Sequence, residues 1–170
     1  MTTRQLRPLV LLSAAILATG SCATLGQIVQ PPEFTAAAGR SSELRLIGPS
    51  TTRPLGGAAL RIWTRVRNPN SFGLTLAALR GNVFLENERA GEVDFPLGLP
   101  LTAAGDTVIP LDINISFSDL PGLVDVAQRI VTRNRVAYRL DGTVTVDAAP
   151  FGQPTFGPST WISGETTVIR

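Results

Sequence analysis

The stretch from Arg61 to Leu76 constrains the fold of this chain most, because it predicts a strand, a sharp bend and a second strand. Before the bend, mostly aliphatic side chains alternate with arginines and a tryptophan, with a period of two residues. Such a period places one set against a core and the other outside, as in a strand with one buried face. The inward set is Leu60, Ile62, Thr64 and Val66, and the outward set is Arg61, Trp63, Arg65 and Arg67.

The bend is the triplet Asn68, Pro69 and Asn70. Proline has no backbone N–H to donate to a neighbouring strand, and it favours an extended conformation of the residue before it. Asn70 and the nearby Gly73 tolerate the left-handed backbone that turns need. We therefore expect these three residues to act as a structural turn between two strands.

Further strands are expected where alternation or β-favouring residues recur between turn signals. The clearest is 106–117, in which five apolar side chains share one face. A hairpin turn is expected at Glu88–Gly91, and Pro96 and Pro100 indicate an edge strand or loop after it. The other expected strands cover 43–48, 75–87, 92–97, 136–147 and 159–169.

One segment has a different period. Between residues 120 and 133, apolar residues recur at the spacing of one helical face, and Pro121 suits a first helical turn. The whole pattern predicts a mainly β protein, an antiparallel two-sheet β-sandwich of about seven strands with one α-helix near residues 120–133.

The N-terminus has the pattern of a lipoprotein signal peptide over residues 1–21. Arg4 and Arg7 precede the apolar run 9–18, and small residues then lead to Cys22. The run is shorter than the roughly 20 residues that cross a bilayer. The sequence LATGSC resembles the lipobox of bacterial lipoproteins, in which the cysteine is acylated and becomes the mature N-terminus. The alternative is an ordinary secreted protein with a chance cysteine near its cleavage site.

Lipidation at Cys22 would anchor the protein, because two or three acyl chains hold a protein stably on a membrane. Ala23 follows the cysteine, where inner-membrane lipoproteins of many Gram-negative bacteria carry aspartate. By that resemblance we expect the outer membrane, facing the periplasm. Residues 22–42 are expected to form the acylated N-terminus and a flexible tether, followed by a β-sandwich domain over 43–170. Ile28 and Phe34 could dock on the domain or on the bilayer.

The residue inventory argues against catalysis. The chain has no His and no Lys, and its single Cys is the predicted lipid acceptor. We therefore expect no enzyme activity, no cofactor and no metal. The 15 basic residues, against 13 acidic ones, form no basic run, so no nucleic-acid partner is expected either.

Two surface features are candidate sites. The outward face of Arg61, Trp63, Arg65 and Arg67 could bind an anionic headgroup, a glycan or a partner strand. Alternatively, the arginine stems cover the ring, or Trp63 packs under the helix. The acidic side chains Glu86, Glu88, Glu92 and Asp94 could bind calcium, or they could belong to a solvated hairpin.

The segment RVRNPNSFGLTLAALRGNVFLENERAGEV, followed by the expected helix and by YRLDGTVTVD, resembles the late-embryogenesis-abundant type-2 proteins and their WHy (water stress and hypersensitive response) domain. The resemblance covers about residues 43–170. It implies an immunoglobulin- or fibronectin-III-like sandwich with one helix, a role in desiccation and other stress, and no known catalysis.

Two functions follow as expectations. The first is a lipid-anchored protective protein of the cell envelope, acting by weak contact with membrane or partly unfolded proteins. The alternative is an envelope assembly or transport accessory that binds a lipid or a partner protein.

Overall fold

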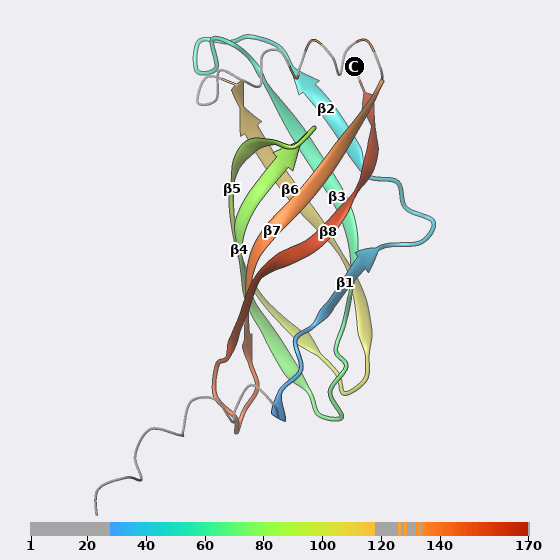
Figure 1. Cartoon of the computed structure of the whole chain (residues 1–170), viewed down its shortest axis with the longest axis vertical. Helices are drawn as coiled ribbons and strands as arrows, with labels where there is room; N and C mark the ends of the chain where they lie inside the picture. The colour runs from blue at the N-terminus through green and yellow to red at the C-terminus, as the bar shows by residue number, and fades with distance from the viewer. Residues whose placement is uncertain (1–27, 118–125, 127, 129–131, 133, 170) are drawn as a thin grey trace, which may run out of the picture.

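The part of the protein that the structure describes is mainly β, as the alternation predicts, and contains eight strands (Figure 1). The structure is a computed structural model, and it describes residues 28–117, 126, 128, 132 and 134–169. The strands are β1 (Glu33–Ala36), β2 (Glu43–Ile47), β3 (Gly57–Arg67), β4 (Leu74–Leu85), β5 (Glu88–Leu101), β6 (Asp106–Ser116), β7 (Arg135–Asp147) and β8 (Thr155–Ile169).

The strands form one hydrogen-bonded mixed sheet, which corrects the prediction of two antiparallel sheets. The order is β1-β3-β2-β8-β7-β4-β5, and β6 pairs with the other side of β3. All pairs are antiparallel except β2 with β8, which are parallel through Glu43 opposite Thr167 and the next two residues. Side chains alternate with period two in both kinds of pairing, so the sequence pattern could not distinguish them.

The sheet encloses a single hydrophobic core. The inward residues predicted for β3, including Leu60, Ile62 and Val66, are all buried, whereas the arginines of the same strand are exposed. The predicted inner face of β6 is also buried from Leu111 to Phe117. Figure 1 shows β7 and β8 crossing in front of β3 and β6, so that the curled sheet covers this core from both sides.

The hairpin between β4 and β5 turns earlier than predicted. Glu86 and Asn87 have φ angles of 49° and 67°, and β5 starts at Glu88. A two-residue turn with two positive φ angles matches the twist of the flanking strands, and asparagine tolerates it well. β5 continues through Pro96 and, among the strands that the structure describes, pairs with β4 alone, so it is an edge strand.

The N-terminal segment contributes a strand that the sequence did not predict. Residues 22–42 were expected to be a tether, yet β1 pairs with β3 from Glu33 opposite Arg67 onwards. Val29 is buried, and Phe34 packs against the core of the domain, which was one of its two expected docking places. Four residues with two apolar side chains, Phe34 and Ala36, are too short to establish a period, so only the sheet reveals this strand.

Two predicted features lie outside the described residues. They are the signal peptide with Cys22 and most of the helix expected near residues 120–133. Val126, which the structure describes, is buried in the core.

Candidate functional site

The Asn-Pro-Asn bend lies between β3 and β4, and its asparagine side chains are inside the protein. Asn68 is 0% exposed. Its side-chain amide donates to the carbonyl oxygens of Phe72, at 2.8 Å, and Thr102, at 3.0 Å. Its Oδ1 accepts from the backbone N–H of Asn70 at 3.0 Å and from the side-chain amide of Asn70 at 2.9 Å. Hydrogen bonds of this kind satisfy backbone groups that the proline bend removes from the sheet.

Asn70 extends the network to the N-terminal segment. Its side-chain amide donates to the carbonyl oxygen of Gln30 at 2.9 Å, and its Oδ1 accepts from the N–H of Gln30 at 2.8 Å. Two backbone hydrogen bonds, each 2.8 Å long, also join the bend to the turn between β5 and β6, through Ala104 and Gly105. The bend therefore connects three segments that are far apart in the sequence.

The arginines of the predicted surface patch on β3 each face a carboxylate on a neighbouring strand. Arg61 donates to Asp112 through Nε at 2.6 Å and through Nη2 at 3.1 Å. The hydrogen bond and the negative charge of Asp112 raise the pKa of Arg61 above its usual value. The other two pairs, both exposed, are Arg65 with Asp106 and Arg67 with Glu33.

Trp63 is half-buried between these arginines, but a different arginine covers it. The guanidinium carbon of Arg40 lies 4.1 Å from the centroid of the indole ring. The structure thus brings the predicted patch residues together on one face and provides acidic partners for all three of its arginines. The net charge of this face, with its acidic partners included, is close to zero, and this weakens the attraction of the face for anions.

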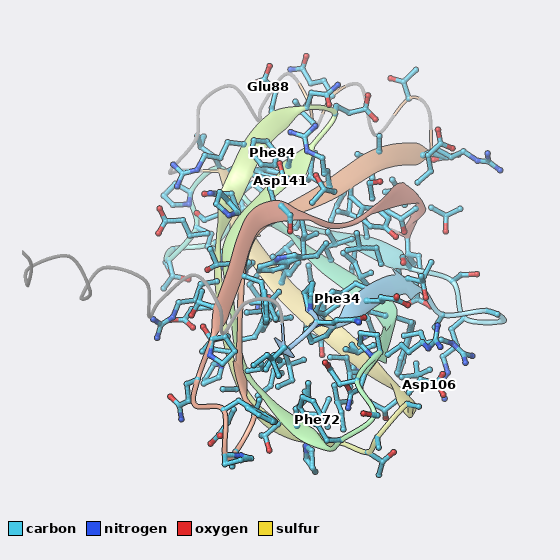
Figure 2. All side chains as sticks on the ribbon, turned by 60° about the horizontal axis from the view of Figure 1, so that its bottom comes forward. Phe34, Phe72, Phe84, Glu88, Asp106 and Asp141 are labelled. Atoms are coloured by element: carbon cyan, nitrogen blue, oxygen red, sulfur yellow. The ribbon has the colours of Figure 1, made fainter. Side chains whose placement is uncertain are left out.

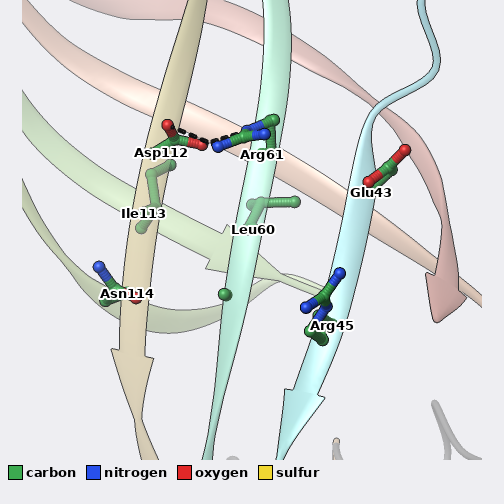
Figure 3. A pocket seen from close by; sticks show the side chains of 8 residues that line it. Glu43, Arg45, Leu60, Arg61, Asp112, Ile113 and Asn114 are labelled. Atoms are coloured by element: carbon green, nitrogen blue, oxygen red, sulfur yellow. Dashed lines mark hydrogen bonds and ion pairs between the residues drawn. The ribbon is translucent and has the colours of Figure 1, made fainter. Parts of the chain in front are cut away.

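A shallow hollow of about 430 Å³ lies beside this face, on the outer side of β2, β3 and β6 (Figure 3). Its floor includes Ala59, a small residue between larger ones. Figure 3 shows Arg61 and Asp112 reaching toward each other at one end, with Arg45 and Asn114 at the other.

The predicted acidic cluster does not converge on one point. The Asp94 carboxylate pairs with Arg80 at 3.2 Å, and Glu86 accepts a hydrogen bond from the N–H of Ala137 at 2.8 Å. Among the described residues, no group of three or more His, Cys, Asp or Glu side chains is placed to hold a metal ion. Within the same part of the chain, no helix is long and apolar enough to cross a membrane.

Sequence reasoning missed Trp161, an important core residue of β8. The register of β7 with β8 shifts so that Leu140 faces Ile162 while Asp141 faces Thr160, and Trp161 is the extra residue of this bulge. The bulge turns the indole ring inward, where it is 6% exposed. The adjacent apolar residues Trp161 and Ile162 interrupt the alternation, and this was the signal available in the sequence.

Trp161 packs between an aromatic ring, that of Phe34, and a glycine, Gly142. The ring centroid of Phe34 lies 6.3 Å from that of Trp161. On the other side, a Cβ atom added to Gly142 would lie 2.8 Å from the indole Cζ2 atom. Gly142 in turn faces Gly81 on β4, so the ring packs on Gly142 where the two strands pair through glycines. Figure 2 shows Phe34 near the middle of the molecule and Phe72 at one end.

Comparisons with known proteins identified a family model and several solved structures that are similar to this chain. A family model described as late embryogenesis abundant protein matches residues 64–160. No curated protein gives a significant match. A solution structure of a protein from Arabidopsis thaliana is 17% identical, with 84% of this chain and 81% of that chain covered and a TM-score of 0.51. A crystal structure of a protein from Archaeoglobus fulgidus is 13% identical, with 75% and 95% covered and a TM-score of 0.45.

The likeness to the Arabidopsis protein shows a shared fold. The family match shows more, because it extends over more than half of the chain and includes the bend, β4 to β7 and the first residues of β8. The protein therefore belongs to the late embryogenesis abundant type-2 family, LEA_2.

Proposed function

We propose that this protein is a non-enzymatic, lipid-anchored protein of the cell envelope that protects the cell during desiccation or related stress. The observation that carries the proposal is the LEA_2 family match, since the family is associated with stress and its members are generally non-catalytic. The proposed lipid anchor at its N-terminus attaches the protein to the membrane.

The lipid anchor is supported by the sequence alone. The positive start, the short apolar run and the small residues before Cys22 resemble the signal peptide and lipobox of bacterial lipoproteins. Ala23 favours the outer membrane, with the domain facing the periplasm of a Gram-negative bacterium. Two or three acyl chains at Cys22 would make this attachment stable.

The protective mechanism is weak contact with membrane or with partly unfolded proteins. Two aromatic rings are available beneath guanidinium groups, Trp63 under Arg40 at 4.1 Å and Phe84 under Arg139 at 4.5 Å. The Trp63 ring can exchange its contact with the exposed Arg40 for an apolar partner at little cost, because an exposed cation–π contact contributes only about 0.5–1 kcal/mol. Arg139 is held more firmly over Phe84, since it also pairs with Asp141 at 2.9 Å. Such surfaces suit many weak clients better than one tight ligand.

The test is survival of bacteria after drying and rehydration. A deletion strain should survive worse than the parent, and the wild-type gene should restore survival. A Cys22→Ser gene should restore it poorly, because the protein would lose its anchor. The intact mass of the mature protein, which reports cleavage before Cys22 and the acyl chains together, must accompany the survival counts.

Equal survival of the deletion strain and the parent would contradict the protective role. In that case, crosslinking in intact cells followed by purification separates the two remaining interpretations. A diffuse set of client proteins would still indicate general contact, whereas one stoichiometric partner would identify an envelope assembly or transport accessory.

A further inference from the structure

The end of the sheet at which the chain enters is built from loops without charged side chains. Four segments meet there, at the bottom of Figure 1. They are residues 28–32, the bend 68–73, the turn 102–105 and the loop 148–154. The hydrogen bonds of Asn70 join the first three, and the rings of Phe72 and Phe151, 5.1 Å apart, join the fourth.

Apolar groups are accessible at this end. Ile28 is 51% exposed, and Phe72 and Phe151 are half-buried. A hollow of about 410 Å³ beside them is lined largely by apolar residues, including Leu74 and Leu101, with Asp147 as its one charged residue. The charged groups that border these loops are ion-paired, Arg67 with Glu33 and Arg65 with Asp106.

The opposite end of the sheet has a different character. Its loop at residues 48–56 contains Arg53, and the hairpin beside it carries Glu86, Glu88 and Arg89. A charged side chain is costly to move toward hydrocarbon, whereas uncharged loops with a few apolar side chains can enter the headgroup boundary.

The length of the segment between Cys22 and Ile28 decides which end of the sheet can face the membrane when Cys22 is anchored there. Five residues lie between Cys22 and Ile28, and the six Cα-to-Cα steps that join the two extend at most about 20 Å. The strands between the two ends are longer, since the 13 residues of β7 span about 40 Å. The inverted orientation would need a connection of about that length, so it is excluded for a protein anchored at Cys22.

We infer that this uncharged end docks on the phospholipid leaflet, with Ile28 and the ring of Phe151 entering the headgroup boundary. The inference rests on the proposed lipid anchor and adds to it an orientation and a contact surface. The β-sheet then stands on the membrane, and the Trp63 face and the charged end remain available to the periplasm.

Spin labelling of the full-length acylated protein in phosphatidylcholine and phosphatidylethanolamine vesicles tests the inference. An acylated Cys22 leaves an introduced cysteine as the single labelling site. Ala103→Cys places the label at the uncharged end, and Thr52→Cys places it at the opposite end. Accessibility to oxygen, relative to a water-soluble nickel complex, should be about fivefold higher at residue 103, because oxygen concentrates in the bilayer and the nickel complex is excluded.

Two matched variants make the measurement specific. Ile28 and Leu55 are similarly exposed, at 51% and 53%, but lie at opposite ends. Ile28→Asp should lower the oxygen-to-nickel ratio at residue 103, and Leu55→Asp should leave it unchanged. Equal ratios at residues 103 and 52 in a protein whose mass shows acyl chains would overturn the docking but keep the anchor. A mature protein without acyl chains would overturn the anchor, and the orientation with it.

Discussion

Asn70 holds the backbone of Gln30 in the way that a neighbouring peptide group would. The side-chain amide donates to the Gln30 carbonyl at 2.9 Å, and the Asn70 Oδ1 accepts from the Gln30 N–H at 2.8 Å. This pair fixes the path by which the chain enters β1, so the family motif at the bend also positions the N-terminal segment. Its effects on stability should therefore extend beyond the bend.

Asn70→Asp should destabilise the protein although the side chain keeps its shape. A carboxylate cannot donate to the Gln30 carbonyl and would face the Asn68 oxygen, so we expect the free energy of unfolding to fall by about 2–3 kcal/mol. Urea unfolding followed by circular dichroism measures the change. Ser71→Ala, at an exposed position in the same bend, is the control and should stay within about 0.5 kcal/mol of wild type. Equal stability of N70D and wild type would contradict the proposed role.

Gly142→Ala should severely impair folding, because no space exists for a methyl group. A Cβ atom there would lie 2.6 Å from the Gly81 Cα and 2.8 Å from the Trp161 ring. Relief requires strand separation or movement of the indole, and we expect a loss of about 3 kcal/mol or more. Gly91→Ala is the matched control on a strand, since its Cβ would meet nothing closer than a Val83 methyl at 3.7 Å. Thermal melts of the two proteins compare them directly.

The two tryptophans should report different environments by fluorescence. In Trp63→Phe the remaining Trp161 is buried beside Phe34, so its emission should lie at shorter wavelength and resist iodide quenching. In Trp161→Phe the remaining Trp63 is half-buried, so iodide should reach it. Equal quenching in the two variants would contradict the inward bulge in β8.

Removing the carboxylates beside β3 should create affinity for anions that the wild type lacks. Asp106→Asn with Asp112→Asn frees Arg65 and Arg61 on one face. In a Cys22→Ser protein, which lacks the proposed anchor, binding to anionic vesicles at low salt should rise and should fall again above about 0.15 M salt. If the Cys22→Ser protein with both carboxylates intact already binds such vesicles, and loses the binding in Arg61→Ala, the paired arginines form a functional patch after all.

The sequence predicted the strands best where an alternating run is long. The rows from Leu60 to Val66 and from Leu111 to Phe117 are buried as expected, because one face of each strand meets the core along its whole length. The short strand at Phe34 and the bulge at Trp161 were missed. The pairing of the first with β3 depends on residues distant in the chain, which a local period does not record. The second left only an interrupted alternation at Trp161 and Ile162, and the pairing of β8 with β7 decides that the ring turns inward.

Some features of the candidate sites could be predicted from the sequence and others could not. The turn-forming residues Asn68 to Asn70 could be recognised, because proline and asparagine act on their own backbone. Their burial could not, and neither could the pairing of Asn70 with Gln30 or of Arg61 with Asp112. These partners lie 40 and 51 residues apart in the sequence.

The sequence by itself determined that this chain is mainly β, where most strands run and which side of each faces the core, because alternation is a local property of the backbone. Only the tertiary structure decided that the strands form one mixed sheet, that β2 lies parallel to β8, and that the arginine face carries its own counter-charges. The physical reason is that pairing direction and charge neutralisation depend on which strands become neighbours, and hydrogen bonds and ion pairs between distant segments set that choice.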